Sequence, residues 1–133
     1  MLNHKHPATP HIIAGPCAFE SRKQLKTCVL GLKKLGVACV RASLWKPRTL
    51  PGWEGMGALS LEALLEETIS RGVIPATEIL TSDHAQLITE ALRVYGEDAQ
   101  MLVWLGSRNQ NHIEQRRIAQ MLAMGPKGIH LMF

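Results

Sequence analysis

The chain has 133 residues, enough for one domain, and 46% hydrophobic with 20% charged residues is the composition of an ordinary folded protein. No apolar run reaches the roughly 18 residues of a transmembrane helix, and the N-terminus lacks the apolar stretch of a secretory signal. The net charge of +4 comes from scattered cations with few aromatic residues between them, which argues against a nucleic-acid surface. By elimination we expect a cytoplasmic protein with neither a membrane nor a nucleic acid as partner.

Short apolar runs alternate with amphipathic segments along the chain. A flexible polar leader is expected at residues 1–10, followed by a single α/β domain over residues 11–133. The apolar runs predict strands at 11–14, 37–40, 73–76, 101–105 and 129–133. Leucines and other apolar residues at helical spacing, closed by glycines, predict helices at 20–35, 60–71, 82–95 and 111–124.

Three local features qualify this pattern. Residues 47–58 are rich in proline and glycine and predict a long loop. Pro75 costs the third strand one ladder hydrogen bond and weakens that prediction. Asn111, followed three residues later by Glu114, predicts a capping box at the start of the last helix.

Strands that are continuously apolar and separated by helices indicate a parallel sheet covered by helices. Two architectures fit four βα units and a fifth strand. One is a five-stranded doubly wound sheet. The other is a partial TIM (β/α)8 barrel, a fold that normally needs about 250 residues.

Polar residues follow each of the first four strands, where a parallel α/β sheet binds its ligands. In chain order these residues are Cys17, then Arg41, Lys46, Arg48 and Thr49, then Glu78, and finally Ser107 and Arg108. Guanidinium and ammonium groups suit phosphate and carboxylate ligands. Four cations with one thiol and one carboxylate therefore predict a polyanionic substrate, most simply a phosphorylated one.

The remaining cysteines and the histidines suggest no metal site by themselves. Cys28 and Cys39 fall in apolar segments and are expected to pack as small core residues, and an odd count of three predicts reduced thiols. The six histidines have no paired spacing of the kind that metal-binding helices show. For Trp45 and Trp53, packing is favoured over stacking on a substrate.

Five segments carry a family resemblance. They are IAGPCAFES (13–21), RASLWKPRT (41–49), GWEG (52–55), PATE (75–78) and WLGSRN (104–109). In this order they resemble the 3-deoxy-7-phosphoheptulonate (DAHP) synthases, in the shorter bacterial branch that includes fusions to chorismate mutase. The related 3-deoxy-octulosonate 8-phosphate synthases carry an Asn-containing variant at KPRT. This segment therefore favours the heptulosonate enzymes and keeps the octulosonate enzymes as the alternative.

The resemblance implies a transferase of aromatic amino acid (shikimate pathway) biosynthesis on a (β/α)8 barrel, condensing phosphoenolpyruvate with erythrose 4-phosphate. It assigns Arg41, Lys46, Ser107 and Arg108 to phosphoenolpyruvate. It assigns Arg48 and Thr49 to the sugar phosphate and places Glu78 near the reacting centre, where Glu78 and Lys46 are the catalytic candidates. It also makes Cys17 a ligand of a divalent metal (Mn, Fe, Co or Zn).

The family's three other metal ligands come from later strands, and one thiolate cannot hold a catalytic metal. We therefore expect this chain alone to be inactive. The sequence stops inside an apolar strand, which favours a fragment of a longer protein; an unstable truncated product and a homo-oligomer that pairs two half barrels are the alternatives. A non-catalytic module that binds phosphate or phosphoenolpyruvate, and a flavodoxin-like interaction domain without a site, also stay open.

Overall fold

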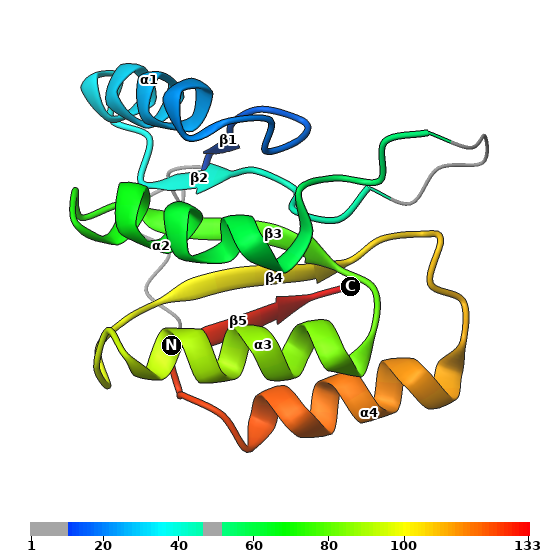
Figure 1. Ribbon diagram of the computed structural model, residues 1–133. Helices are drawn as coiled ribbons and strands as arrows, with labels where there is room; N and C mark the ends of the chain where they lie inside the picture. Colours follow the sequence, from blue (N-terminus) through cyan, green and yellow to red (C-terminus); the bar gives the residue numbers. More distant parts are fainter. Residues whose placement is uncertain (1–10, 47–51) are drawn as a thin grey trace, which may run out of the picture.

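Five parallel strands form one sheet in the computed structural model, which describes residues 11–46 and 52–133 (Figure 1). The strands are β1 (Ile13–Ala14), β2 (Cys39–Arg41), β3 (Ile74–Ile79), β4 (Met101–Leu105) and β5 (Ile129–Met132). All five fall where apolar runs predict them. The predicted leader and the KPRT segment beyond Lys46 lie outside the described residues.

Helices connect the strands, and three of them begin at a side-chain cap that the sequence contains. The helices are α1 (Arg22–Lys34), the short 3-10 helix η1 (Gly57–Ser60), α2 (Leu61–Ile69), α3 (Ser82–Arg93) and α4 (His112–Ala123). Ser21, Thr81 and Asn111 accept hydrogen bonds from backbone N–H groups in the first turns of α1, α3 and α4. These bonds satisfy donors that have no partner inside the helix.

The strand order β1-β2-β3-β4-β5 decides between the two predicted architectures. Every crossover connects neighbouring parallel strands and steps in the same direction, and such crossovers are right-handed, so the helices gather on one face of the sheet. A doubly wound sheet would reverse its strand order and place helices on both faces. Figure 1 shows α2, α3 and α4 together on one face, as a partial (β/α)8 barrel requires.

The hydrophobic core lies between the sheet and this helix layer. Val40 of β2 and Met101 and Val103 of β4 are fully buried against the apolar faces of the helices. The largest buried side chains of the helices include Leu25, Leu64, Ile88 and Ile118. None of the helices formed by residues 11–46 and 52–133 has the length and apolarity needed to cross a bilayer. Cys28 and Cys39 are half-buried free thiols, so they pack at the margin of the core rather than inside it.

Two local predictions need correction. The predicted capping box is half formed, because Asn111 caps α4 but the Glu114 carboxylate instead accepts from the Ser82 backbone N–H at 2.5 Å. Glu114 thus supports the start of the neighbouring helix α3. β3 also runs through Pro75 and continues to Ile79, because the strands on both sides hold it in register.

Candidate functional site

The turn after β1 is pressed against the backbone of β2. A Cβ atom on Gly15 would lie 2.0 Å from the Arg41 carbonyl oxygen, and Gly15 has a φ of 149°, so only glycine fits here. Further along the turn, the Phe19 N–H donates to the Ser43 carbonyl at 2.9 Å. These contacts fix the exposed Cys17 beside the carboxyl end of β2.

The chain beyond β2 forms a second fixed segment, which we call the Lys46 arm and define as residues 44–46 and 52–57. The Leu44 N–H donates to the buried Thr77 hydroxyl at 3.1 Å and so ties the arm to β3. Backbone hydrogen bonds join its two halves, from Lys46 N to Glu54 O at 2.7 Å and from Gly57 N to Leu44 O at 2.9 Å.

Cys17 and Lys46 meet at this end of the sheet. The Lys46 ammonium donates to the Cys17 sulfur, with Nζ and Sγ 3.0 Å apart. That hydrogen bond lowers the pKa of the Cys17 thiol. Burial opposes this shift, and the charges of Lys46 and Arg41 lower the pKa further, so that the net direction is downward. The arrangement therefore favours a thiolate between two cations.

Arg41 lies between the thiol and β4. Its guanidinium carbon is 5.5 Å from the centre of the Trp104 ring, a cation–π contact that aligns the side chain across β3. The buried Arg41 Nε has no hydrogen-bond partner among the residues that the structure describes. A buried guanidinium donor without an acceptor is costly, and an anionic ligand would supply that acceptor.

Glu78 is half-buried in β3, directly beside Trp104 in the sheet register. A Cβ atom on Gly106 would come within 1.8 Å of the Glu78 carboxylate oxygen, so the glycine after β4 leaves the space that the carboxylate fills. Glu78 thereby reaches the same edge of the sheet as Arg41, the neighbouring strand's cation.

Ser107 and Arg108 follow β4 at this edge and are exposed. Arg108 lies in a turn shaped by Asn109, whose side-chain amide donates to the Leu80 carbonyl at 2.7 Å, and it lines a surface hollow of about 420 Å³ together with Glu114. The structure thus brings Cys17, Arg41 and Lys46 into one cluster, with Glu78 on the adjacent strand and Ser107 and Arg108 on the rim. Arg48 and Thr49 lie outside the described residues.

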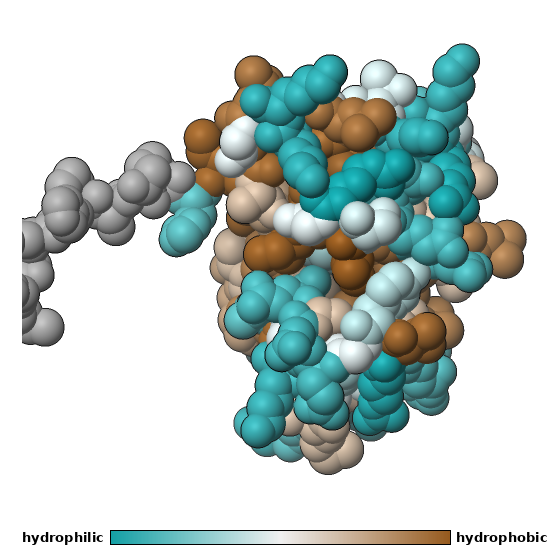
Figure 2. All heavy atoms as spheres, turned by 90° about the vertical axis from the view of Figure 1, so that its left-hand side faces the viewer, coloured by the Kyte–Doolittle hydropathy of each residue, from teal (hydrophilic) through white to brown (hydrophobic). Residues whose placement is uncertain are grey.

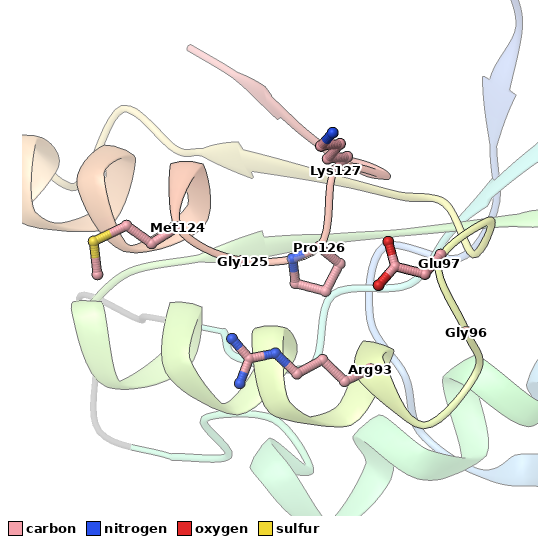
Figure 3. Close-up of a pocket in the computed structure, with 7 residues that line it drawn as sticks. All are labelled: Arg93, Gly96, Glu97, Met124, Gly125, Pro126 and Lys127. Carbon is pink, nitrogen blue, oxygen red and sulfur yellow. The ribbon is translucent and has the colours of Figure 1, made fainter.

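A hollow at the opposite end of the sheet offers a comparison. It has a volume of about 480 Å³, lies between the C-terminal ends of α3 and α4, and contains Arg93, Glu97 and Lys127 (Figure 3). The two cationic side chains extend in different directions and do not converge on one point. Figure 2 views the molecule from this amino end of the strands, where hydrophobic and hydrophilic side chains are interspersed.

The donor atoms of the cluster do not fit a bound metal by themselves. Cys17 supplies one thiolate, but no three His, Cys, Asp or Glu side chains within residues 11–46 and 52–133 are grouped so that they could hold one ion. Sites that hold a catalytic divalent ion use about three or four protein ligands. We derive no chemical step through a metal for this reason.

One residue near the cluster escaped the sequence analysis. The His84 ring stacks on the Trp45 ring, with centroids 3.8 Å apart and planes at 11°. Packing was the expected role for Trp45, but no spacing rule connects it with a histidine 39 positions away. Only the return of β3 to this edge of the sheet makes them neighbours.

The parallel βα series with its sequential strand order defines the chain as part of a (β/α)8 barrel, with cations gathered at the carboxyl ends of its strands. Comparison with known proteins identifies the barrel more closely. The chain belongs to the DAHP synthetase I family, whose model matches residues 7–122.

A curated relative and two solved structures agree with this membership. Phospho-2-dehydro-3-deoxyheptonate aldolase of Thermotoga maritima is 35% identical over 99 residues, which cover 74% of this chain and 27% of the relative. A crystal structure of DAHP synthase from Thermotoga maritima matches with a TM-score of 0.58 at 28% identity, covering 90% of this chain and 40% of that one. A truncated form of the Thermotoga maritima synthase matches with a TM-score of 0.52, also at 28% identity, covering 90% of this chain and 49% of that one. The chain thus spans less than half the length of these relatives.

Proposed function

We propose that this chain supplies the phosphoenolpyruvate-binding side of a DAHP synthase site. The full reaction of that site joins phosphoenolpyruvate to erythrose 4-phosphate. The methylene carbon of phosphoenolpyruvate forms a bond to the aldehyde carbon, whose oxygen takes up a proton. Water adds to the neighbouring carbon that carries the phosphate, and inorganic phosphate leaves from that carbon. The observation that carries the proposal is the Arg41 guanidinium, whose buried Nε has no acceptor among the described residues, beside a lysine held at the same edge.

Each residue of the cluster has a role that follows from its place. Arg41 and Lys46 neutralise the phosphate and carboxylate of phosphoenolpyruvate, and Arg108 completes the charge from the rim of β4. The Ser107 backbone N–H is a further donor at that rim. Glu78 is the one carboxylate at the end of β3, and we assign to it the orientation of water or the transfer of a proton near the reacting carbon.

Two further parts of the family site complete the proposal. Cys17 is proposed as one ligand of a divalent ion, whose other ligands would come from outside the described residues. Arg48 and Thr49 are proposed to hold the phosphate of erythrose 4-phosphate, and the preference for this sugar over the octulosonate enzymes' substrate depends on the KPRT sequence alone.

Calorimetry with phosphoenolpyruvate tests the binding role. We expect the chain to bind phosphoenolpyruvate, and Arg41→Ala to weaken binding by roughly ten- to a hundredfold, the loss typical of a charge-assisted hydrogen bond. Arg93→Ala is the matched control, because it removes the same charge at the opposite end of the sheet (Figure 3). Equal affinities for the two variants would contradict the proposal.

A turnover assay tests whether this chain contains only part of the catalytic site. With phosphoenolpyruvate, erythrose 4-phosphate and Mn²⁺, we expect no product from the 133-residue chain, because its described residues offer a single metal ligand at the site. The lack of grouped metal ligands among the described residues also favours the second candidate function, a module that binds phosphoenolpyruvate without converting it. Product formation at a rate proportional to protein concentration would show that this expectation is wrong.

A further inference from the structure

The Trp45 side chain is held between two elements that are distant in the sequence. One face of its indole stacks on the half-buried imidazole of His84, near the start of α3. The Gly57 position faces the indole nitrogen, since a Cβ atom there would lie 3.8 Å from Trp45 Nε1. The neighbour of Trp45 in the chain is Lys46, so the orientation of the indole constrains where the lysine side chain starts.

His84 is itself fixed. Its backbone N–H donates to the Thr81 hydroxyl at 3.3 Å, and its Nδ1 accepts from the Leu80 N–H at 3.2 Å. Burial lowers the pKa of His84, with the Asp83 charge opposing it, and this keeps the ring neutral and able to accept. The imidazole is therefore a rigid platform belonging to the end of β3 and the first turn of α3.

The Lys46 arm is tied to β3 at one end and to the turn after β1 at the other. Leu44 is buried and tied to β3, but two residues later Lys46 reaches the exposed Cys17 sulfur. Between these points the Trp45 ring is the side chain that contacts α3. Loss of the stack would remove this contact with α3 and leave Lys46 its backbone hydrogen bond to Glu54 and its contact with the Cys17 sulfur.

We propose that His84 is a positioning residue for the phosphoenolpyruvate site, acting through its stack on Trp45 to hold the Lys46 ammonium at the carboxyl edge of the sheet. The affinity part of this inference rests on the function proposed above, whereas the placement of the arm does not. No pattern in the sequence assigns His84 to the site, because its contact depends on the ring geometry alone.

Amide hydrogen exchange of the full chain, measured by NMR at constant pH, tests the placement. In His84→Ala we expect the amides of Lys46 and Gly57 to exchange roughly three- to tenfold faster, the factor that corresponds to losing an aromatic pair, while the amide of Val103 in β4 is unchanged. His84→Phe keeps a ring for the stack without the Nδ1 acceptor and should restore slow exchange. His112→Ala, an exposed histidine at the start of α4, is the matched control.

Each result is decisive. Unchanged exchange in His84→Ala, failure of His84→Phe to restore it, or equal acceleration at Val103 overturns the inference, because the last would show a loss of global stability only. Phosphoenolpyruvate affinity measured on the same variants should weaken by a similar roughly three- to tenfold factor in His84→Ala and recover in His84→Phe. If the unmodified chain binds no phosphoenolpyruvate but the exchange pattern holds, the proposed function fails and the positioning by His84 stands.

Discussion

Two charged clusters of this molecule differ in whether their cations are paired with carboxylates. Between α1 and α2, the Glu67 carboxylate lies within 2.7 Å of Arg22 and of Arg71, and Arg22 also contacts Glu66 at 2.7 Å. At the carboxyl edge of the sheet, Lys46 contacts the Cys17 thiol and Arg41 contacts the Trp104 ring, and neither forms an ion pair with a carboxylate of the described residues. In the first cluster the cations and carboxylates pair with one another, whereas Arg41 and Lys46 have no carboxylate partner among the described residues.

The difference separates charges that stabilise the fold by pairing with each other from charges that we propose bind a ligand. Burial would raise the pKa of Glu67, but the hydrogen bond from Arg22 and the charges of Arg71, Arg22 and Lys26 outweigh it and lower the pKa. Glu67 thus contributes to stability as a paired anion. The cations of the second cluster have no such carboxylate among the described residues, and we propose that a phosphorylated ligand provides the opposite charge.

The largest expected effect comes from the backbone contact beneath the cation cluster. Gly15→Ala places a Cβ atom against the Arg41 carbonyl at a positive φ, so we expect a loss of about 3 kcal/mol in the free energy of unfolding, measured by urea denaturation. Gly31→Ala is the matched control, since its Cβ meets nothing within 4 Å on α1, and it should stabilise the helix by about 0.5–1 kcal/mol. Similar midpoints for the two variants would contradict the tight approach.

Substitutions in the cluster between α1 and α2 should change the free energy of unfolding strongly and ligand affinity little. Glu67→Gln leaves two guanidinium groups facing a neutral amide, and we expect a loss of about 2 kcal/mol in the free energy of unfolding with unchanged phosphoenolpyruvate affinity. Glu66→Gln, at the more exposed carboxylate of the same helix, should cost clearly less. A weakened affinity in Glu67→Gln would remove the distinction between the clusters.

A smaller effect is expected from pH. Because burial lowers the pKa of His84 in the folded state, the unfolded chain binds more protons, and the His84 contribution to stability is complete above the unfolded value of about 6.5. This contribution is lost as the pH falls through the folded pKa. Thermal unfolding of the chain and of His84→Phe should therefore diverge below about pH 6.5, with the variant less sensitive to acid. Parallel profiles would contradict the assignment.

The smallest stability change is expected in the cation cluster itself. Lys46→Met removes a half-buried cation that has no carboxylate partner among the described residues, so the free energy of unfolding should change by less than about 0.5 kcal/mol. The same variant should lose phosphoenolpyruvate affinity in calorimetry. A stability loss as large as that of Glu67→Gln would mean that Lys46 has a structural role after all.

The fold could be read largely from the sequence because its signals are local. Apolar runs and helical spacing placed every strand and α-helix, and Asn111 marked the start of α4 correctly. The 3-10 helix η1 was missed, because it begins inside the segment 47–58 that was predicted as a loop. The choice between a doubly wound sheet and a barrel required the strand order, which depends on pairings between distant segments. The partner of Glu114 also lay beyond prediction, since Ser82 is 32 positions away.

The residues that gather at the candidate site could be predicted from the sequence, but the ring contact beside them could not. Cys17, Arg41 and Lys46 were predicted to meet because the carboxyl ends of parallel strands share an edge, and the structure brings them together. Their assignment to phosphoenolpyruvate stays a prediction, as does the metal role of Cys17. The stack of Trp45 on His84 had no sequence signal, because ring geometry is set by the packing of three elements at once.

The sequential strand order has a consequence for how the chain acquires its structure. Each strand pairs with the strand formed about 30 residues earlier, so each new pairing closes only a short loop at a modest entropic cost. The β1–β2 pair can serve as a template before β4 and β5 have left the ribosome. Vectorial, unit-by-unit folding during synthesis is therefore built into the topology, and pulse-labelling of nascent chains should show protection advancing from the amino terminus.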